Sequence, residues 1–245
     1  MGATHSPEEN MRAALLAIAL AAVPGAQAAH AQDIGDVVAY AALISTPAAG
    51  LAPVAAPYMI GERQTSAAFA ARYGRLSDGG ISRNAFAADI TFPVGKGSAG
   101  LIAGYLNNSC DGCDGYFVAG AHADAPIVTA GSPASQLFTV GVSGMLGLAK
   151  PTDVTVLTLS ADLPVAVAIP AGRARVVPFI APGFGFGRVS GGGESESGTR
   201  FMLGAGVGLM NIAPGLGVSV GAKRVFIDGA KTVFGAGVSW QGGHH

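Results

Sequence analysis

The last long stretch of the chain, residues 199–240, alternates large apolar residues with small or polar ones at every second position. Because successive side chains of a β-strand point to opposite faces, this spacing predicts three strands, each with one apolar face. A helix would need apolar spacings of three and four residues, which are missing here. The three apolar rows are Phe201, Leu203, Ala205, Val207 and Leu209; Leu216, Val218, Val220 and Ala222; and Phe234, Ala236, Val238 and Trp240.

The composition leaves too few charged residues to solvate an ordinary protein surface. Half of the 245 residues are hydrophobic and 12% are charged, compared with ~25% charged residues in typical soluble domains. The formal net charge of -1 at pH 7 gives no reason to expect a nucleic-acid partner. The apolar faces of the predicted strands therefore need an environment other than water.

The N-terminal region shows the ordered features of an export signal. Arg12 supplies a positive charge, residues 13–23 form an apolar run, and Ala29-His30-Ala31 is an Ala-x-Ala cleavage sequence before Gln32. Polar residues precede this pattern, so Met11 is an alternative start. We predict a signal peptide over residues 1–31 that is cleaved on export.

The rest of the chain lacks a segment suited to a membrane-spanning helix, which needs ~20 apolar residues. Residues 37–60 are apolar, but three prolines interrupt them. Within lipid, only helices and closed barrels satisfy every backbone hydrogen bond. We therefore predict an all-β fold, a closed antiparallel transmembrane β-barrel in up-and-down meander order, located in the outer membrane.

Alternating segments separated by turn sequences extend over residues 66–240, which we take as the barrel. They give ten strands, and eight is the alternative, since an even number is expected. We expect a long periplasmic link at residues 125–135 and a flexible acidic outer loop at residues 191–198. Residues 32–65, rich in Ala and Pro, are expected to form a periplasmic lead-in, with a plug in the lumen as the alternative. Residues 241–245 form a short tail.

The register of the strands decides where the few charged residues lie. A shift by one residue would exchange the two faces of a strand, and an Arg or Lys facing lipid at mid-depth costs ~2–4 kcal/mol. With the bulky rows facing outward, acidic and basic side chains both point into the lumen, where they can pair. The predicted lumen cluster consists of Arg72, Asp89, His122, Asp124, Asp162 and Lys223.

The final strand resembles the C-terminal strand of small outer-membrane β-barrels of Gram-negative bacteria, the OmpA-like and OmpX-like families. Trp240 matches their terminal aromatic residue, and Phe234, Ala236 and Val238 match the alternating row before it. Those barrels usually end at the aromatic residue, whereas here Gln-Gly-Gly-His-His follows. The resemblance implies that these four residues form the signal recognised by the barrel-assembly machinery; it says little about activity.

The two cysteines, Cys110 and Cys113, lie in a polar loop as a Cys-x-x-Cys sequence. A zinc site would need four ligands, and a thioredoxin-like site would need a βαβ setting. In an exported chain we favour a structural disulfide between them.

The sequence contains no convincing catalytic constellation. His122 is the only histidine between the signal and the tail, and Asp124 shares its strand face. An outer-membrane hydrolase would need a base, an acid and a nucleophile near the outer rim, whereas the expected topology puts this pair near the periplasmic end. We therefore expect no enzyme activity, cofactor or metal.

The expected function is a non-catalytic structural or surface-interaction role in the outer membrane. The first alternative is a narrow porin or small-solute channel, although a barrel of this size usually has an interior filled with side chains. The second alternative is an outer-membrane hydrolase. Expected partners are outer-membrane lipid and the barrel-assembly machinery, with small solutes added for a channel.

Overall fold

The computed structural model describes residues 40–44, 46–62, 64–78, 81–109, 114–132, 134–151, 153–227 and 231–242. In this part, residues 40–44 are helical, α3 (Pro47–Gly50) is a short helix and η2 (Pro57–Ile60) is a 3-10 helix. The strands are β1 (Ala68–Asp78), β2 (Ile81–Val94), β3 (Gly97–Asn108), β4 (Tyr116–Gly131), β5 (Leu137–Ala149), β6 (Thr155–Asp162), β7 (Val165–Ala171), β8 (Ala174–Gly191), β9 (Glu194–Ala213), β10 (Leu216–Val225) and β11 (Thr232–Gln241).

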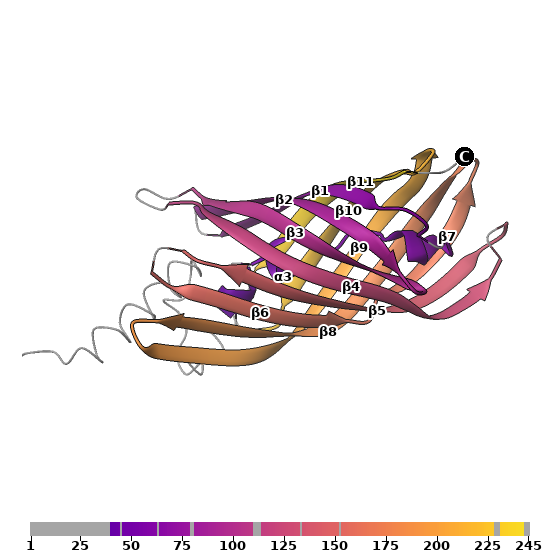
Figure 1. Cartoon of the computed structure of the whole chain (residues 1–245). Helices are drawn as coiled ribbons and strands as arrows, with labels where there is room; N and C mark the ends of the chain where they lie inside the picture. Colours follow the sequence, from indigo (N-terminus) through magenta and orange to yellow (C-terminus); the bar gives the residue numbers. More distant parts are fainter. Residues whose placement is uncertain are drawn as a thin grey trace, which may run out of the picture.

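Ten strands form a closed antiparallel ring in meander order (Figure 1). The ring closes where β1 pairs with β11 along their length. The additional short strand β7 continues β6 beyond Leu163 and Pro164. Both strands pair with β5 and β8 in one register, as Asp162 opposite Ser143 and Val165 opposite Val140 show. The predicted fold class and strand number are confirmed.

The bulky apolar rows lie on the outside of the ring. Phe234 is 62% exposed and Leu101 61%, whereas Asp89 on the inner face is 4% exposed. Tyr73 packs on Phe86 and Tyr105 packs on Phe117, so aromatic side chains meet across neighbouring strands on this outer face. The predicted register is therefore the observed one.

The two ends of the barrel differ in their connections. At one end, here called the turn end, residues 95–96, 172–173 and 214–215 form tight turns, and β1 begins and β11 finishes there. The turn-end link from β4 to β5, residues 132–136, is longer. At the other end, here called the loop end, three links are longer, those from β3 to β4, from β5 to β6 and from β10 to β11, while β1–β2 and β8–β9 are joined by two residues each.

Two expected loops are wrong. β4 continues to Gly131, and β8 and β9 pair up to Gly191 and Glu194, so only Gly192 and Gly193 turn between them. In both places polar or irregular sequence remains in the strand, because backbone pairing continues past the apolar band.

The described part of residues 40–62, here called the plug segment, lies inside the barrel, where α3 is surrounded by strands (Figure 1). Tyr40, Leu43, Ile44 and Ile60 are at most 1% exposed. The expectation that residues 32–65 precede the barrel as a periplasmic lead-in is thus wrong for these residues. The reason is that the plug segment buries its apolar side chains against the wall, in three clusters that it shares with inward-facing strand residues.

Glycines on the inner face give the plug segment its space. A Cβ atom added to Gly204 would lie 2.8 Å from Pro53 Cγ, and one added to Gly237 would lie 2.7 Å from Val54 Cγ1. A methyl group at either site would therefore overlap the plug segment. Glycine on the inner face is here a packing requirement, because it lets the wall and the plug segment approach closely.

In the part of the chain that the structure describes, no helix is long and apolar enough to cross a membrane. The expected signal peptide, residues 1–31, lies outside the described residues, as do Cys110 and Cys113 with their expected disulfide.

Candidate functional site in the barrel lumen

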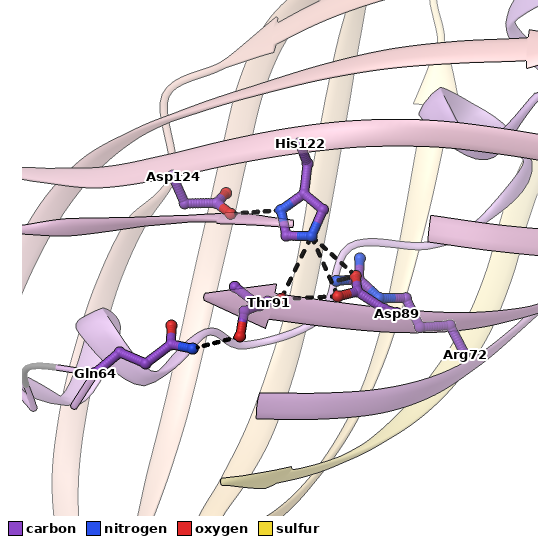
Figure 2. Close-up of polar contacts among 6 residues, drawn as sticks. All are labelled: Gln64, Arg72, Asp89, Thr91, His122 and Asp124. Carbon is purple, nitrogen blue, oxygen red and sulfur yellow. Dashed lines mark hydrogen bonds and ion pairs between the residues drawn. The ribbon is translucent and has the colours of Figure 1, made fainter. Parts of the chain in front are cut away.

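A network of charged side chains on β1, β2 and β4 lies on the inner face of the wall, and Figure 2 shows its members. Arg72 on β1 donates from Nη2 to Asp89 Oδ2 on β2 at 2.6 Å. The Asp89 side chain is 1% exposed and also accepts a hydrogen bond of 2.7 Å from Thr91 Oγ1. A buried carboxylate needs such donors, because desolvation without partners costs several kcal/mol.

His122 reaches this network across an intervening strand. It lies on β4, and β3 separates it from Asp89 and Thr91 on β2. The β3 residue opposite both Thr91 and His122 is Gly100, and an added Cβ there would lie 2.5 Å from His122 Nε2. The imidazole therefore occupies the space that a side chain at Gly100 would fill. Its Nε2 lies 3.2 Å from Asp89 Oδ1 and 3.4 Å from Thr91 Oγ1.

The second ring nitrogen of His122 also faces a carboxylate. Nδ1 lies 2.9 Å from Asp124 Oδ2, in the same strand (Figure 2). Carboxylate oxygens accept hydrogen bonds, so an imidazole that donates from both nitrogens satisfies both contacts. Thr91 donates its own hydroxyl proton to Asp89. The arrangement resembles a base beside a nucleophile in its distances but works as a set of charge-assisted hydrogen bonds.

The two remaining lumen residues form a separate pair. Lys223 Nζ on β10 lies 3.3 Å from Asp162 Oδ2 on β6. In the ladder between these two strands, Gly204 of β9 stands opposite Lys223 and Ala181 of β8 stands opposite Gly204. The structure thus brings the six predicted residues together as one network of four and one pair of two.

A cavity of about 130 Å³ lies between the plug segment and the wall and is lined by both groups. This space accommodates several water molecules beside polar side chains. On the plug side, Tyr58 lines the cavity, and burial together with Asp124 and Asp162 raises the pKa of its phenol above the ordinary value. Gln64 lines the cavity near the turn end, where its Nε2 donates to the Thr91 carbonyl at 2.9 Å (Figure 2). The same nitrogen donates to the Ser66 carbonyl at 3.0 Å.

Sequence reasoning missed the residues that hold the plug segment. Arg175 donates to the Ile60 carbonyl, Asn211 Nδ2 donates to Glu62 Oε1 at 2.7 Å, and Thr46 and Thr158 hydroxyls lie 2.6 Å apart. The sequence did carry one sign of this arrangement, since its inner rows are rich in glycine and leave the lumen unfilled by wall side chains.

The four residues of the expected assembly signal lie on β11 next to the seam with β1. Phe234, Ala236, Val238 and Trp240 point outward, and Trp240 stacks on Phe69 of β1 with ring centroids 6.3 Å apart. Among the described residues, no group of three or more His, Cys, Asp or Glu side chains is placed to hold a metal ion.

Neither a protein-family model nor a curated protein matches the chain. It is similar to the solved β-domain of the Bordetella autotransporter BrkA (14% identity, 71% of this chain and 97% of that one, TM-score 0.40). It is also similar to the attachment invasion locus protein Ail of Yersinia pestis (15% identity, 71% and 97% covered, TM-score 0.32) and to the N-terminal barrel of Pseudomonas aeruginosa OprF (11% identity, 73% and 98% covered, TM-score 0.32).

TM-scores this low carry no argument, so the class of this protein rests on its own architecture. A closed antiparallel ring of ten strands, with bulky apolar rows outside and charged pairs inside, defines a transmembrane β-barrel of the outer-membrane type.

Proposed function

We propose that the protein is a non-catalytic barrel with a structural or surface-interaction role, and that its lumen is sealed by its own plug segment. The observation that carries this proposal is the burial of the plug segment along the lumen. Tyr40 and Leu43 pack with Met202 and Val233 near the loop end. Met59 and Ile60 pack with other wall residues, including Leu137, near the turn end. The described plug residues thus occupy lumen space that an aqueous path for a solute would need.

The absence of catalysis is part of the same proposal. His122 is the one histidine of the lumen network, and each of its ring nitrogens faces a carboxylate. In this role the network pins β1, β2 and β4 to one another. We expect no hydrolysis of lipid or peptide substrates by the wild type that His122→Ala would remove. We expect His122→Ala only to lower the stability of the barrel.

A narrow channel is the second candidate, and the cavity of about 130 Å³ with charged side chains in its lining is the observation that favours it. The cavity holds charges of both signs, which suits small hydrophilic solutes. It would carry solutes only after the plug segment moved, because that segment forms one of its sides.

Single-channel recording in planar bilayers tests the sealed lumen. We expect the folded wild-type protein to give no stable conductance steps, and a variant lacking residues 40–62 to give them. Folding of both proteins is checked by β-sheet circular dichroism and by the change of electrophoretic mobility on heating. Stable steps in the wild type would overturn the sealed lumen in favour of the channel.

Export, localisation and assembly belong to the proposal as well. We propose cleavage before Gln32, outer-membrane residence in a Gram-negative envelope, and recognition of the β11 row by the barrel-assembly machinery. N-terminal sequencing of the protein from isolated outer membranes tests the first two. Recovery of the protein in the inner membrane or the soluble fraction would contradict them.

A further inference from the structure

The plug segment crosses the lumen in one direction, and that direction determines where the preceding chain lies. The start of the plug segment is at the loop end. Tyr40 Oη accepts a hydrogen bond of 3.0 Å from the backbone nitrogen of Lys231, directly before β11 begins at Thr232. Tyr40 and Leu43 also cluster with Val225, the last residue of β10 at this end.

The path then follows β9, which runs from the loop end to the turn end. Leu43 shares a cluster with Met202, Pro53 lies against Gly204, and Ala55 lies against Gly208. Glu62 accepts a hydrogen bond from Asn211, two residues before β9 ends. The order of contacts along β9 thus matches the order of residues along the plug segment, so the described residues make a single pass.

After this pass, the chain enters the wall at the turn end. Gln64 binds the Thr91 carbonyl near the end of β2, and β1 begins at Ala68 opposite Gln241 of β11. Both ends of the barrel wall are therefore at the turn end, while Tyr40, the first residue of the plug segment, is at the opposite end.

In outer-membrane barrels the short turns face the periplasm and the longer loops face the exterior. We infer that the chain before Tyr40 leaves the barrel at the exterior, so that the plug segment presents the N-terminal part of the exported protein at the cell surface. This inference rests on the outer-membrane location in the proposed function. It deepens the surface-interaction role, because it places an N-terminal segment beside the outer loops, where an extracellular partner could reach it.

Cysteine labelling in intact cells tests the inference. In a Cys110→Ser, Cys113→Ser background, single cysteines are placed by Asp36→Cys before the plug segment, Lys150→Cys at the loop end and Lys96→Cys at the turn end. Lys150 and Lys96 are both exposed and provide matched controls for the two sides. The probe is a membrane-impermeant maleimide, applied before and after permeabilisation.

We expect Asp36→Cys and Lys150→Cys to react in intact cells and Lys96→Cys to react only after permeabilisation. Any other behaviour of Asp36→Cys beside correct controls overturns the inference while leaving the sealed barrel standing. If the two controls react alike, the membrane orientation is wrong, and the inference and the proposed location fail together.

A second variant excludes a minor population in which the plug segment has left the lumen. The Thr46 and Thr158 hydroxyl oxygens are 2.6 Å apart, so Thr46→Cys with Thr158→Cys is placed to form a disulfide that fixes the plug segment to the wall. In this variant, an epitope tag inserted at residue 36 should bind antibody on intact cells to the same extent as without the disulfide. Loss of antibody binding on forming the disulfide overturns the inference.

Discussion

The outer and inner faces of the same strands differ in the kinds of side chain they carry and in the contacts these side chains make. The outer face carries bulky side chains with no protein partner beyond their neighbours, such as Leu101 and Phe234, which are more than half exposed. The inner face carries glycines, apolar side chains packed on the plug segment, such as Met202 and Phe179, and charged residues with named partners, as Asp89 contacts Arg72. The comparison teaches that the outer face tolerates changes of shape but not of polarity, while the inner face is sensitive to both.

Of the changes that test this comparison, removing the charge of Asp89 should lower the free energy of unfolding most. Asp89→Asn removes the carboxylate that Arg72 and His122 share. The site is buried, since the Asp89 side chain is 1% exposed. Breaking a buried ion pair from one side typically costs ~3–5 kcal/mol, so we expect a loss of that order in the free energy of unfolding. Denaturant titration in lipid vesicles, followed by Trp240 fluorescence, measures it.

Asp124→Asn is the matched control for this variant. Within the network, Asp124 pairs with His122, and its side chain is 15% exposed. We expect a clearly smaller loss for it. Equal losses for the two variants would contradict the central place of Asp89 in the network.

Introducing a charge on the outer face should have the next largest effect. Val220 lies near the middle of β10 and is 55% exposed, so Val220→Lys would place an ammonium group in the acyl region. The expected loss is ~2–4 kcal/mol, the cost of a lysine at the bilayer midplane. Val220→Leu keeps the polarity and should be nearly neutral in the same titration. If Val220→Lys left the free energy of unfolding unchanged, this row would not face lipid.

A change of shape on the inner face should cost less but should affect the plug segment directly. A Cβ at Gly74 would overlap the Gly50 carbonyl and lie 3.1 Å from the Leu51 Cα atom. Overpacking of this kind costs ~1–3 kcal/mol, so Gly74→Val should lower the unfolding free energy and produce intermittent conductance as the plug segment shifts. Ala71→Val, on the exposed outer face of the same strand, should do neither. Equal behaviour of the two variants would contradict the close contact of plug segment and wall.

These contrasts also separate what the sequence could predict from what it could not. The alternation from Phe201 to Leu209 was sufficient to predict the strand, its register and its outward face, because one periodicity determines all three. The inward position of Asp89 followed from the same rule. The partners of Asp89 could not be predicted in this way. The contact with His122 depends on the pairing of β3 with both β2 and β4, which places Gly100 between the two side chains.

The plug segment was harder to predict because its contacts are long-range and irregular. Residues 40–62 show no strand periodicity, and their position depends on glycines such as Gly204 and Gly237 far along the chain. The strand ends were missed for a local reason. Glu194 and its polar neighbours remain paired with β8 beyond the apolar band, where backbone hydrogen bonds hold the ladder without apolar side chains.

The smallest expected effect concerns the seam between the first and last strands, where the outer face does contain a specific contact. Phe69 and Trp240 stack with an interplanar angle of 21° across the β1–β11 pair. Aromatic pairs contribute ~0.5–1.5 kcal/mol beyond area burial. A double-mutant cycle of Phe69→Ala and Trp240→Ala should give a coupling energy in that range, and Trp240→Phe should keep most of it.

The chain has a single tryptophan, so this cycle is followed by circular dichroism instead of fluorescence. The cycle of Phe234→Ala with Phe69→Ala serves as the reference, because Phe234 lies opposite Arg75 of β1, away from Phe69. Coupling as large in the reference as in the seam pair would mean that the outer aromatics contribute only through lipid contact. Coupling confined to the seam pair would show that the outer face requires a defined shape at the point where the barrel closes.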